Sequence, residues 1–158
     1  MEEQDRSLWD HAQIGEGLQL VERALRIPGI GPYQLQAAIA AIHAQAKNAR
    51  DTDWPQVAML YERLMDVMPS AVVALNHAVA VAMSGDLEAG LTLVEEAGSA
   101  GKLEGYYLFH AARADLLRRL KRPQQAAQAY RRALALATNH VEQQYLRRRL
   151  TELFNDLP

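Results

Sequence analysis

The stretch from Pro69 to Asp86 limits what this chain can fold into more than any other, because it is apolar on nearly every side. It begins with a proline and a capping serine, and its run Ala71–Met83 holds only two polar side chains, Asn76 and His77. A helix with this composition is buried. Its length of about 20 Å, at about 1.5 Å per residue, is too short to cross a membrane. We therefore expect the other elements of the chain to pack around it.

The composition is that of a single globular domain, which we place at residues 1–158. Hydrophobic residues make up 49% of the chain, and its length is sufficient to bury a core. There is no cysteine, which excludes disulfides, thiolate metal sites and cysteine nucleophiles. The first residues, MEEQDRSLWD, lack the pattern of a signal peptide. We expect a cytoplasmic protein.

Charge is unevenly distributed along the chain. Residues 1–100 carry six basic and fourteen acidic side chains, whereas residues 101–158 carry eleven basic and five acidic ones. The two parts could attract each other within a curved molecule, or present surfaces of opposite sign to partners. The simpler interpretation is that these charges lie on ordinary solvated helix faces.

Helical periodicity runs through the whole sequence, and no segment has the alternating, β-branched pattern of a strand. Proline and glycine separate the helical segments, and the predicted capping residues include Asp53, Ser70 and Asp86. The sequence predicts an all-α fold of about eight helices, joined by short connections and arranged in antiparallel pairs. The predicted helices cover about Ser7–Arg26, Pro32–Ala46, Asp53–Met68, Ala71–Met83, Asp86–Ala97 and Gly105–Leu120, with a seventh from Pro123 and an eighth from Asn139 to about Phe154.

The spacing of small and apolar residues indicates a repeat of helix pairs. Val57, Gly90 and Ala126 take the same position in three pairs, 33 and 36 residues apart. This spacing is close to the period of about 34 residues in tetratricopeptide repeats. A helix pair cannot bury both of its apolar stripes alone, so such pairs stack, and we predict a tetratricopeptide-like, right-handed solenoid. The small positions where the two helices of a pair cross are Ala38, Ala78 and Ala114.

Six stretches of the sequence together are similar to one known family. They are QDRSLWD (Gln4–Asp10), GPYQLQAAIAAIHA (Gly31–Ala44), TDWPQ (Thr52–Gln56), PSAVVALNHAVAVA (Pro69–Ala82), GYYLFHAARADLLRRL (Gly105–Leu120) and YRRALALA (Tyr130–Ala137). From Gln4 to Leu153 the chain resembles the C-terminal tetratricopeptide-like extension of extracytoplasmic-function (ECF) RNA polymerase sigma factors. The resemblance implies a regulatory, protein-interaction module that supports transcription initiation and has no enzymatic role.

The resemblance also implies the partners, which are the sigma domains of the parent chain, core RNA polymerase, or both. Neither sigma domain precedes Gln4 in this sequence. We therefore expect a C-terminal fragment of a longer sigma factor. Met1 itself has two interpretations, a start within a repeat or a cut from a longer protein. The alternative function is an autonomous tetratricopeptide-like scaffold that binds an unrelated protein or peptide.

Two features could indicate DNA binding. The turn Arg26–Pro32 contains the PGIG sequence of helix-hairpin-helix motifs, but Leu35 stands where such motifs usually have a small residue. The second feature is the arginine-rich C-terminal part. There Arg118 and Arg119 lie near a helix end, where the helix dipole favours positive charge in any case. We do not expect this domain to bind nucleic acid directly.

The sequence has no pattern of catalytic, cofactor-binding or metal-ligating residues. His43, His77 and His110 recur at nearly the repeat period, but no histidine lies three or four residues from another. The serines stand at predicted caps or linkers, and there is no glycine-rich phosphate-binding loop. We expect no enzymatic activity, no cofactor, no metal and no membrane association.

In a tetratricopeptide stack, the first helix of each pair lines the inner face. The predicted inner-face rows in this chain are Leu35, Ile39, Ile42 and His43; Leu75, Val79, Ala82 and Met83; and Ala111, Asp115, Arg118 and Arg119. The first two rows are apolar, so we predict that a domain of the parent chain, a partner helix or another copy covers them. The alternative is a tightly wound solenoid that closes over its own groove.

A second candidate site lies near the N-terminus and includes Asp5, Arg6, Ser7 and Trp9. Ser7 is the predicted cap of the first helix, and Trp9 is predicted to close the end of the stack. The alternative is that this cluster docks the sigma domains. The candidate partner-binding residues are therefore Asp5, Arg6, Trp9, Leu35, Ile39, His43, Leu75, Val79, Asp115, Arg118 and Arg119.

Overall fold

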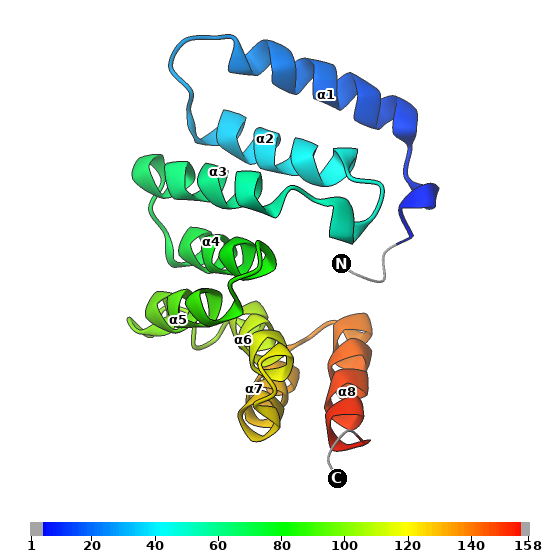
Figure 1. Ribbon diagram of the computed structural model, residues 1–158, viewed down its shortest axis with the longest axis vertical. Coiled ribbons are helices and arrows are strands. Elements are labelled where there is room, and N and C mark those ends of the chain that lie inside the picture. Colours follow the sequence, from blue (N-terminus) through cyan, green and yellow to red (C-terminus); the bar gives the residue numbers. More distant parts are fainter. Residues whose placement is uncertain (1–4, 156–158) are drawn as a thin grey trace.

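The computed structural model describes residues 5–155, and within them the fold is all-α, as expected. Met1 and Gln4, which enter the expectations above, lie outside the described residues. Figure 1 shows the helices following one another in chain order from α1 to α8. They are α1 (His11–Leu25), α2 (Pro32–Gln45), α3 (Trp54–Val67), α4 (Ala71–Met83), α5 (Leu87–Gly98), α6 (Tyr107–Arg119), α7 (Pro123–Leu136) and α8 (His140–Asn155), with short 3₁₀ helices η1 (Arg6–Leu8) and η2 (Ala49–Asp51).

Three predicted capping side chains fix where α3, α4 and α5 begin. Asp53, Ser70 and Asp86 each accept a hydrogen bond from a backbone N–H in the first turn of the helix that follows, at 3.0–3.1 Å. Each bond satisfies a donor that has no partner within the helix. These helix starts therefore follow from local sequence alone, and their prediction is confirmed.

The predicted cap of the first helix is wrong. α1 begins at His11, because the Asp10 carboxylate accepts hydrogen bonds from two N–H groups of its first turn, both at 3.0 Å. Ser7 belongs to η1, where its N–H and its hydroxyl both donate to the Asp5 carboxylate. The segment before α1 is thus a separate short turn with its own cap.

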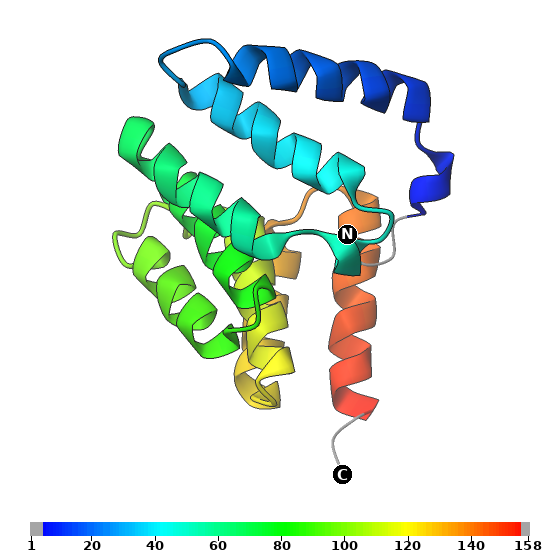
Figure 2. The ribbon, with the colours of Figure 1, turned by 45° about the horizontal axis from the view of Figure 1, so that its top comes forward.

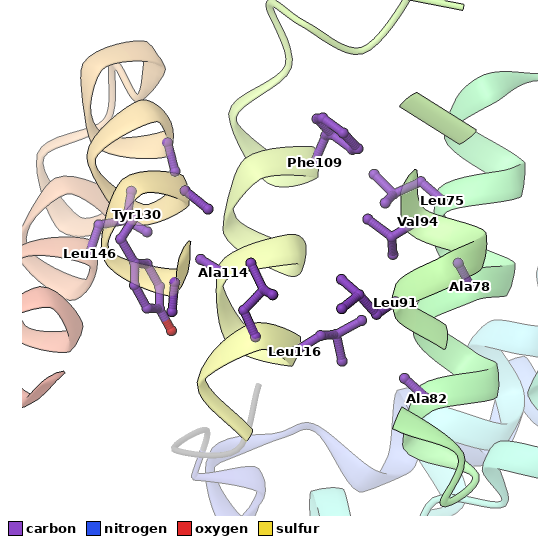
Figure 3. Packing of buried hydrophobic residues seen from close by; sticks show 14 of the residues in the cluster. Leu75, Ala78, Ala82, Leu91, Val94, Phe109, Ala114, Leu116, Tyr130 and Leu146 are labelled. Carbon is purple, nitrogen blue, oxygen red and sulfur yellow. The ribbon is translucent and has the colours of Figure 1, made fainter. Parts of the chain in front are cut away.

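The central stretch, α4, lies between two clusters of buried side chains. Val73 and Ala80 belong to a cluster shared with α2 and α3, whereas Leu75, Ala78 and Ala82 belong to a larger one formed with α5, α6, α7 and α8. Figure 3 shows the larger cluster, in which side chains of α4 and α5 lie beside those of α6. α4 contacts α3, α5 and α6. The expectation that the other elements pack around this stretch is confirmed for α3, α5 and α6, whereas α1 packs against α2 and α8 packs against α7.

One side of α4 nevertheless stays open. Val72 is 41% exposed and Asn76 is exposed as well. The expectation of burial on nearly every side is therefore wrong for this side of the helix. The reason is that α4 is covered from two directions by successive helices and not enclosed by a ring of them.

Two glycines allow close approaches between neighbouring helices. A Cβ atom built on Gly90 of α5 would lie 2.4 Å from the Ala82 Cβ of α4 and 2.8 Å from the Ala82 Cα. A Cβ on Gly98 would lie 2.4 Å from the Phe109 ring of α6. Because real Cβ contacts are longer than 3.0 Å, only glycine fits at these two positions without a shift of neighbouring atoms.

Helices that are neighbours in sequence are neighbours in space. Each helix from α1 to α7 packs against the next one, and α4–α5 and α6–α7 are the most extensive of these contacts. Figure 2 shows α1 lying along α2 at one end of the molecule. None of the helices in the described part of the chain is both long enough and apolar enough to cross a membrane.

Candidate interaction surfaces

Four of the predicted inner-face residues belong to the core: Leu35, Ile39, Leu75 and Ala82. Leu35 and Ile39 are 3% and 5% exposed, in the cluster that α2 forms with α3 and α4. Leu75 is 2% exposed in the larger cluster. The prediction that a partner covers these side chains is wrong, because the chain's own helices pack on them. Val79, from the same predicted row, is partly buried.

The third predicted row does form a polar cluster. The Arg118 Nη2 donates to Asp115 Oδ1 at 2.6 Å, and the Arg119 Nε donates to Asp115 Oδ2 at 2.7 Å. Arg119 also reaches across to α4, where its Nη1 lies 3.3 Å from the Met83 Sδ. All three charged side chains are between 24% and 29% exposed. We call Asp115, Arg118 and Arg119 the α6 polar cluster.

Tyr130 of α7 lies beside the α6 polar cluster and was not among the candidate site residues. It is 1% exposed. Burial and the nearby Asp115 carboxylate together raise the pKa of Tyr130 to about 12, against the opposing effect of the Arg118 guanidinium. The repeat pattern marks this position as a core aromatic, but it does not reveal that the phenol lies near Asp115 and Arg118.

The N-terminal cluster is a structural anchor. Arg6 is 7% exposed, and its Nη1 donates to the carbonyl oxygens of His43, Ala46 and Asn48 at 2.9, 2.6 and 3.4 Å. These carbonyls lie at and beyond the C-terminal end of α2, where a cation is favoured by unpaired carbonyls and by the helix dipole. The Trp9 ring lies 4.9 Å from the Arg6 guanidinium carbon. Because Arg6 is buried, it is not open to a docking partner.

His43 completes this anchor. Its ring meets the Trp54 ring edge to face, with centroids 5.2 Å apart. Burial lowers the pKa of His43, and the positive charge of Arg6 lowers it further. The environment therefore favours the neutral imidazole of His43, which packs against Trp54. Asp5, by contrast, is exposed and caps η1.

A surface that the sequence did not reveal lies between α1 and α2. α1 is fully described, and none of its 15 residues is buried, whereas each helix from α2 to α8 has at least one buried side chain. An open cavity of about 220 Å³ lies between the two helices, which also contact each other. We call it the α1–α2 groove; it is lined by Ile14, Gly17, Leu18 and Val21 of α1 and by Ala37, Ala40, Ala41 and Ala44 of α2.

The groove continues toward the N-terminal anchor. A second hollow of about 340 Å³ shares Ile14 and Ala44 with it and extends to Trp9 and Gln13. Large apolar side chains also lie exposed nearby in sequence, including Tyr33, which is 82% exposed. In the sequence, the run AAIAAIHA in α2 could have indicated this groove, because it places short side chains opposite the apolar stripe of α1. That inference required knowing which face of α2 meets α1.

Within residues 5–155, no group of three or more histidine, cysteine, aspartate or glutamate side chains is placed to hold a metal ion.

Charge pairs link the acidic and basic parts of the chain within the molecule. Arg113 lies 3.0 Å from Glu95, and Arg122 lies 2.6 Å from Glu88. Some of the attraction expected between the two parts is therefore internal, between α5 and both α6 and the turn that follows α6.

Comparison with known proteins finds one informative relative. An uncharacterized protein of Rhizobium meliloti (strain 1021) is 45% identical to this chain over 153 residues. The alignment covers 97% of this chain but 36% of the relative, so the chain spans about a third of the length of the relative that it matches. No family model matches the chain, and no solved structure matches it. This chain is therefore similar to one segment of a longer protein.

Proposed function

We propose that this chain is a tetratricopeptide-like module of an ECF sigma factor, with its helix pairs stacked as a right-handed solenoid. In this proposal the module forms one domain of a longer cytoplasmic chain. It supports transcription initiation through contacts with the sigma domains or with core RNA polymerase, and it has no enzymatic role. The six family-like stretches, which run from the N-terminal anchor to α7, support this reading.

The observation that carries the proposal is the burial of the predicted repeat positions. Val57 and Ala126 are 0% exposed, and Gly90 is buried against Ala82. Buried small residues at one repeat position are what a stack of helix pairs needs, because each pair must approach the next closely. The crossing positions of the preceding helices are also buried: Ala38 at 8%, Ala78 at 0% and Ala114 at 0% exposed.

A transcript comparison in Rhizobium meliloti tests the function. We would build a chimera, which is the relative with its matching segment replaced by this chain, and compare it with the relative lacking that segment. The proposal predicts that the relative and the chimera raise the same set of transcripts and that the shortened relative does not. If neither the relative nor the chimera changes any transcript, the proposal is contradicted.

The α6 polar cluster is the predicted contact surface that remains partly exposed. Replacing Arg118 with Gln removes a charge at that cluster, and replacing Arg132 with Gln removes one from an exposed position of α7. If the cluster contacts the sigma domains or the polymerase, Arg118→Gln should lower transcript induction by the chimera and Arg132→Gln should not. Equal induction by both variants would remove the cluster from the contact surface.

A further inference from the structure

We propose that the α1–α2 groove receives the apolar face of an amphipathic helix from the sigma domains of the longer chain. This inference rests on the proposed function and names the surface on which it acts. At this groove the fold leaves an apolar interface unfilled.

The packing between α1 and α2 is incomplete. α1 contacts α2 and has no comparable contact with any other described helix. Its apolar stripe meets alanines, whose short side chains do not fill the space between the two helix axes. The cavity of about 220 Å³ therefore has room for large aliphatic or aromatic side chains of an occupant.

The lining sets the chemistry of the occupant. All eight residues that line the 220 Å³ cavity are glycine, alanine, valine, leucine or isoleucine. A charged or strongly polar ligand would lose its hydration there without gaining a hydrogen bond. An amphipathic helix would place apolar residues in the groove and keep its polar side in water, as helix-in-groove complexes do.

The position of the groove favours an occupant in the same chain. The groove continues through Ile14 and Ala44 to Trp9, next to the anchor where Arg6 fixes the chain to the end of α2. In the relative, the larger part of the chain lies outside the matching segment. A helix in that part of the same chain would meet the groove at high effective concentration, so modest contacts would suffice.

Two glycines of α1 provide a matched test. Gly17 lines the groove and Gly15 does not. A Cβ on either glycine would meet no heavy atom within 4 Å outside its own helix backbone and chain neighbours. Gly17→Leu therefore fills the groove, and Gly15→Leu makes the same chemical change and the same gain in helix propensity elsewhere on α1.

Amide hydrogen exchange would be measured helix by helix in the isolated chain and in the chimera, for the unsubstituted sequence and for both variants. Docking predicts that α1 amides exchange about tenfold more slowly, or slower still, in the chimera than in the isolated chain. Gly15→Leu should keep this difference, and Gly17→Leu should abolish it. Comparing each variant with its own isolated form removes any effect on the stability of α1 itself.

Other outcomes separate this inference from the proposed function. Slower exchange in α6 without a change in α1 would overturn the groove and leave the sigma-domain contact standing. No change in any helix of the chimera would overturn both. If α1 of the isolated chain becomes protected as concentration rises, a second copy fills the groove and the proposed occupant is wrong. Equal protection in Gly15→Leu and Gly17→Leu chimeras would also overturn it.

Discussion

Replacing Gly90 with Ala tests the close packing of α5 against α4. The new methyl group would lie 2.4 Å from the Ala82 Cβ, 2.8 Å from its Cα and 2.9 Å from its backbone nitrogen. Two of these three atoms belong to the backbone of α4, so the clash cannot be relieved by rotating a side chain. α4 and α5 must move apart, and the buried contacts of Leu91 and Val94 loosen with them.

Two opposing effects set the magnitude. Glycine to alanine within a helix gains about 0.8–1 kcal/mol of helix propensity. Overpacking a well-packed interface costs about 1–3 kcal/mol and sometimes more. Because backbone must shift, we expect the cost to dominate and the free energy of unfolding to fall by about 1–2 kcal/mol. For a domain of this size that lowers the melting temperature by about 2–8 °C.

Thermal and urea unfolding followed by circular dichroism would measure this loss. Gly15→Ala is the matched control, because its Cβ meets no heavy atom within 4 Å, and it should stabilise the chain by about 0.5–1 kcal/mol. Ala82→Gly in the Gly90→Ala background removes one clashing methyl group, so the double-mutant cycle should show a favourable coupling of about 0.5–3 kcal/mol. A Gly90→Ala protein as stable as the unsubstituted chain would refute the packing argument.

Three further predictions concern a helix end, the N-terminal anchor and pH. Lys121 has a φ of 57°, in the left-handed region that favours glycine, so Lys121→Gly should raise the free energy of unfolding by about 0.5–1 kcal/mol in a thermal melt. Arg6→Ala should lower it by about 2–3 kcal/mol in urea, because α2 carbonyls lose a charged donor, whereas the exposed Arg26→Ala should change it by at most about 0.5 kcal/mol. The pKa of Tyr130 is about 12 in the folded chain and 10.0 without the fold, so the unfolded form loses its proton first. Stability should therefore fall as pH rises from about 10 to about 12. Tyr130→Phe should reduce that fall in urea titrations across this range, and an unchanged fall would show that the phenol is not responsible.

The helix starts were predictable because their causes are local. Asp53, Ser70 and Asp86 each cap the helix that follows, and a cap acts within the first turn. The start of α1 was misjudged because several candidate caps stand close together. Ser7 and Asp10 both fit the capping pattern, and the choice depends on η1, which Arg6 holds on the end of α2.

The candidate site was only partly predictable because it depends on how each helix is rotated about its axis. Leu35 and Leu75 fit an inner-face row in the repeat alignment, but neighbouring helices pack on exactly that side of α2 and α4 in the folded chain. Asp115 and Arg118 were found because charged residues stay near solvent whatever the rotation. The α1–α2 groove exists because side chains do not fill the space between the two helices. A pattern of alanines in the sequence does not show whether such an interface is filled or empty.

Burial and charge also decided the role of the N-terminal residues. Trp9 was predicted to close the end of the stack, and it lies against Arg6 at the end of α2. That Arg6 itself would be buried was not foreseeable from sequence, because arginine is seldom buried unless its donors are satisfied. Here main-chain carbonyls satisfy it, and these come together only when α2 has formed.

The most direct test of the central claim is a binding titration of the immobilised chain. The titrants would be core RNA polymerase, the full-length Rhizobium meliloti relative, and duplex DNA at two salt concentrations. The account predicts saturable binding to at least one of the two proteins and none to DNA. Binding to neither protein, or binding to DNA alone that weakens with salt, would contradict it.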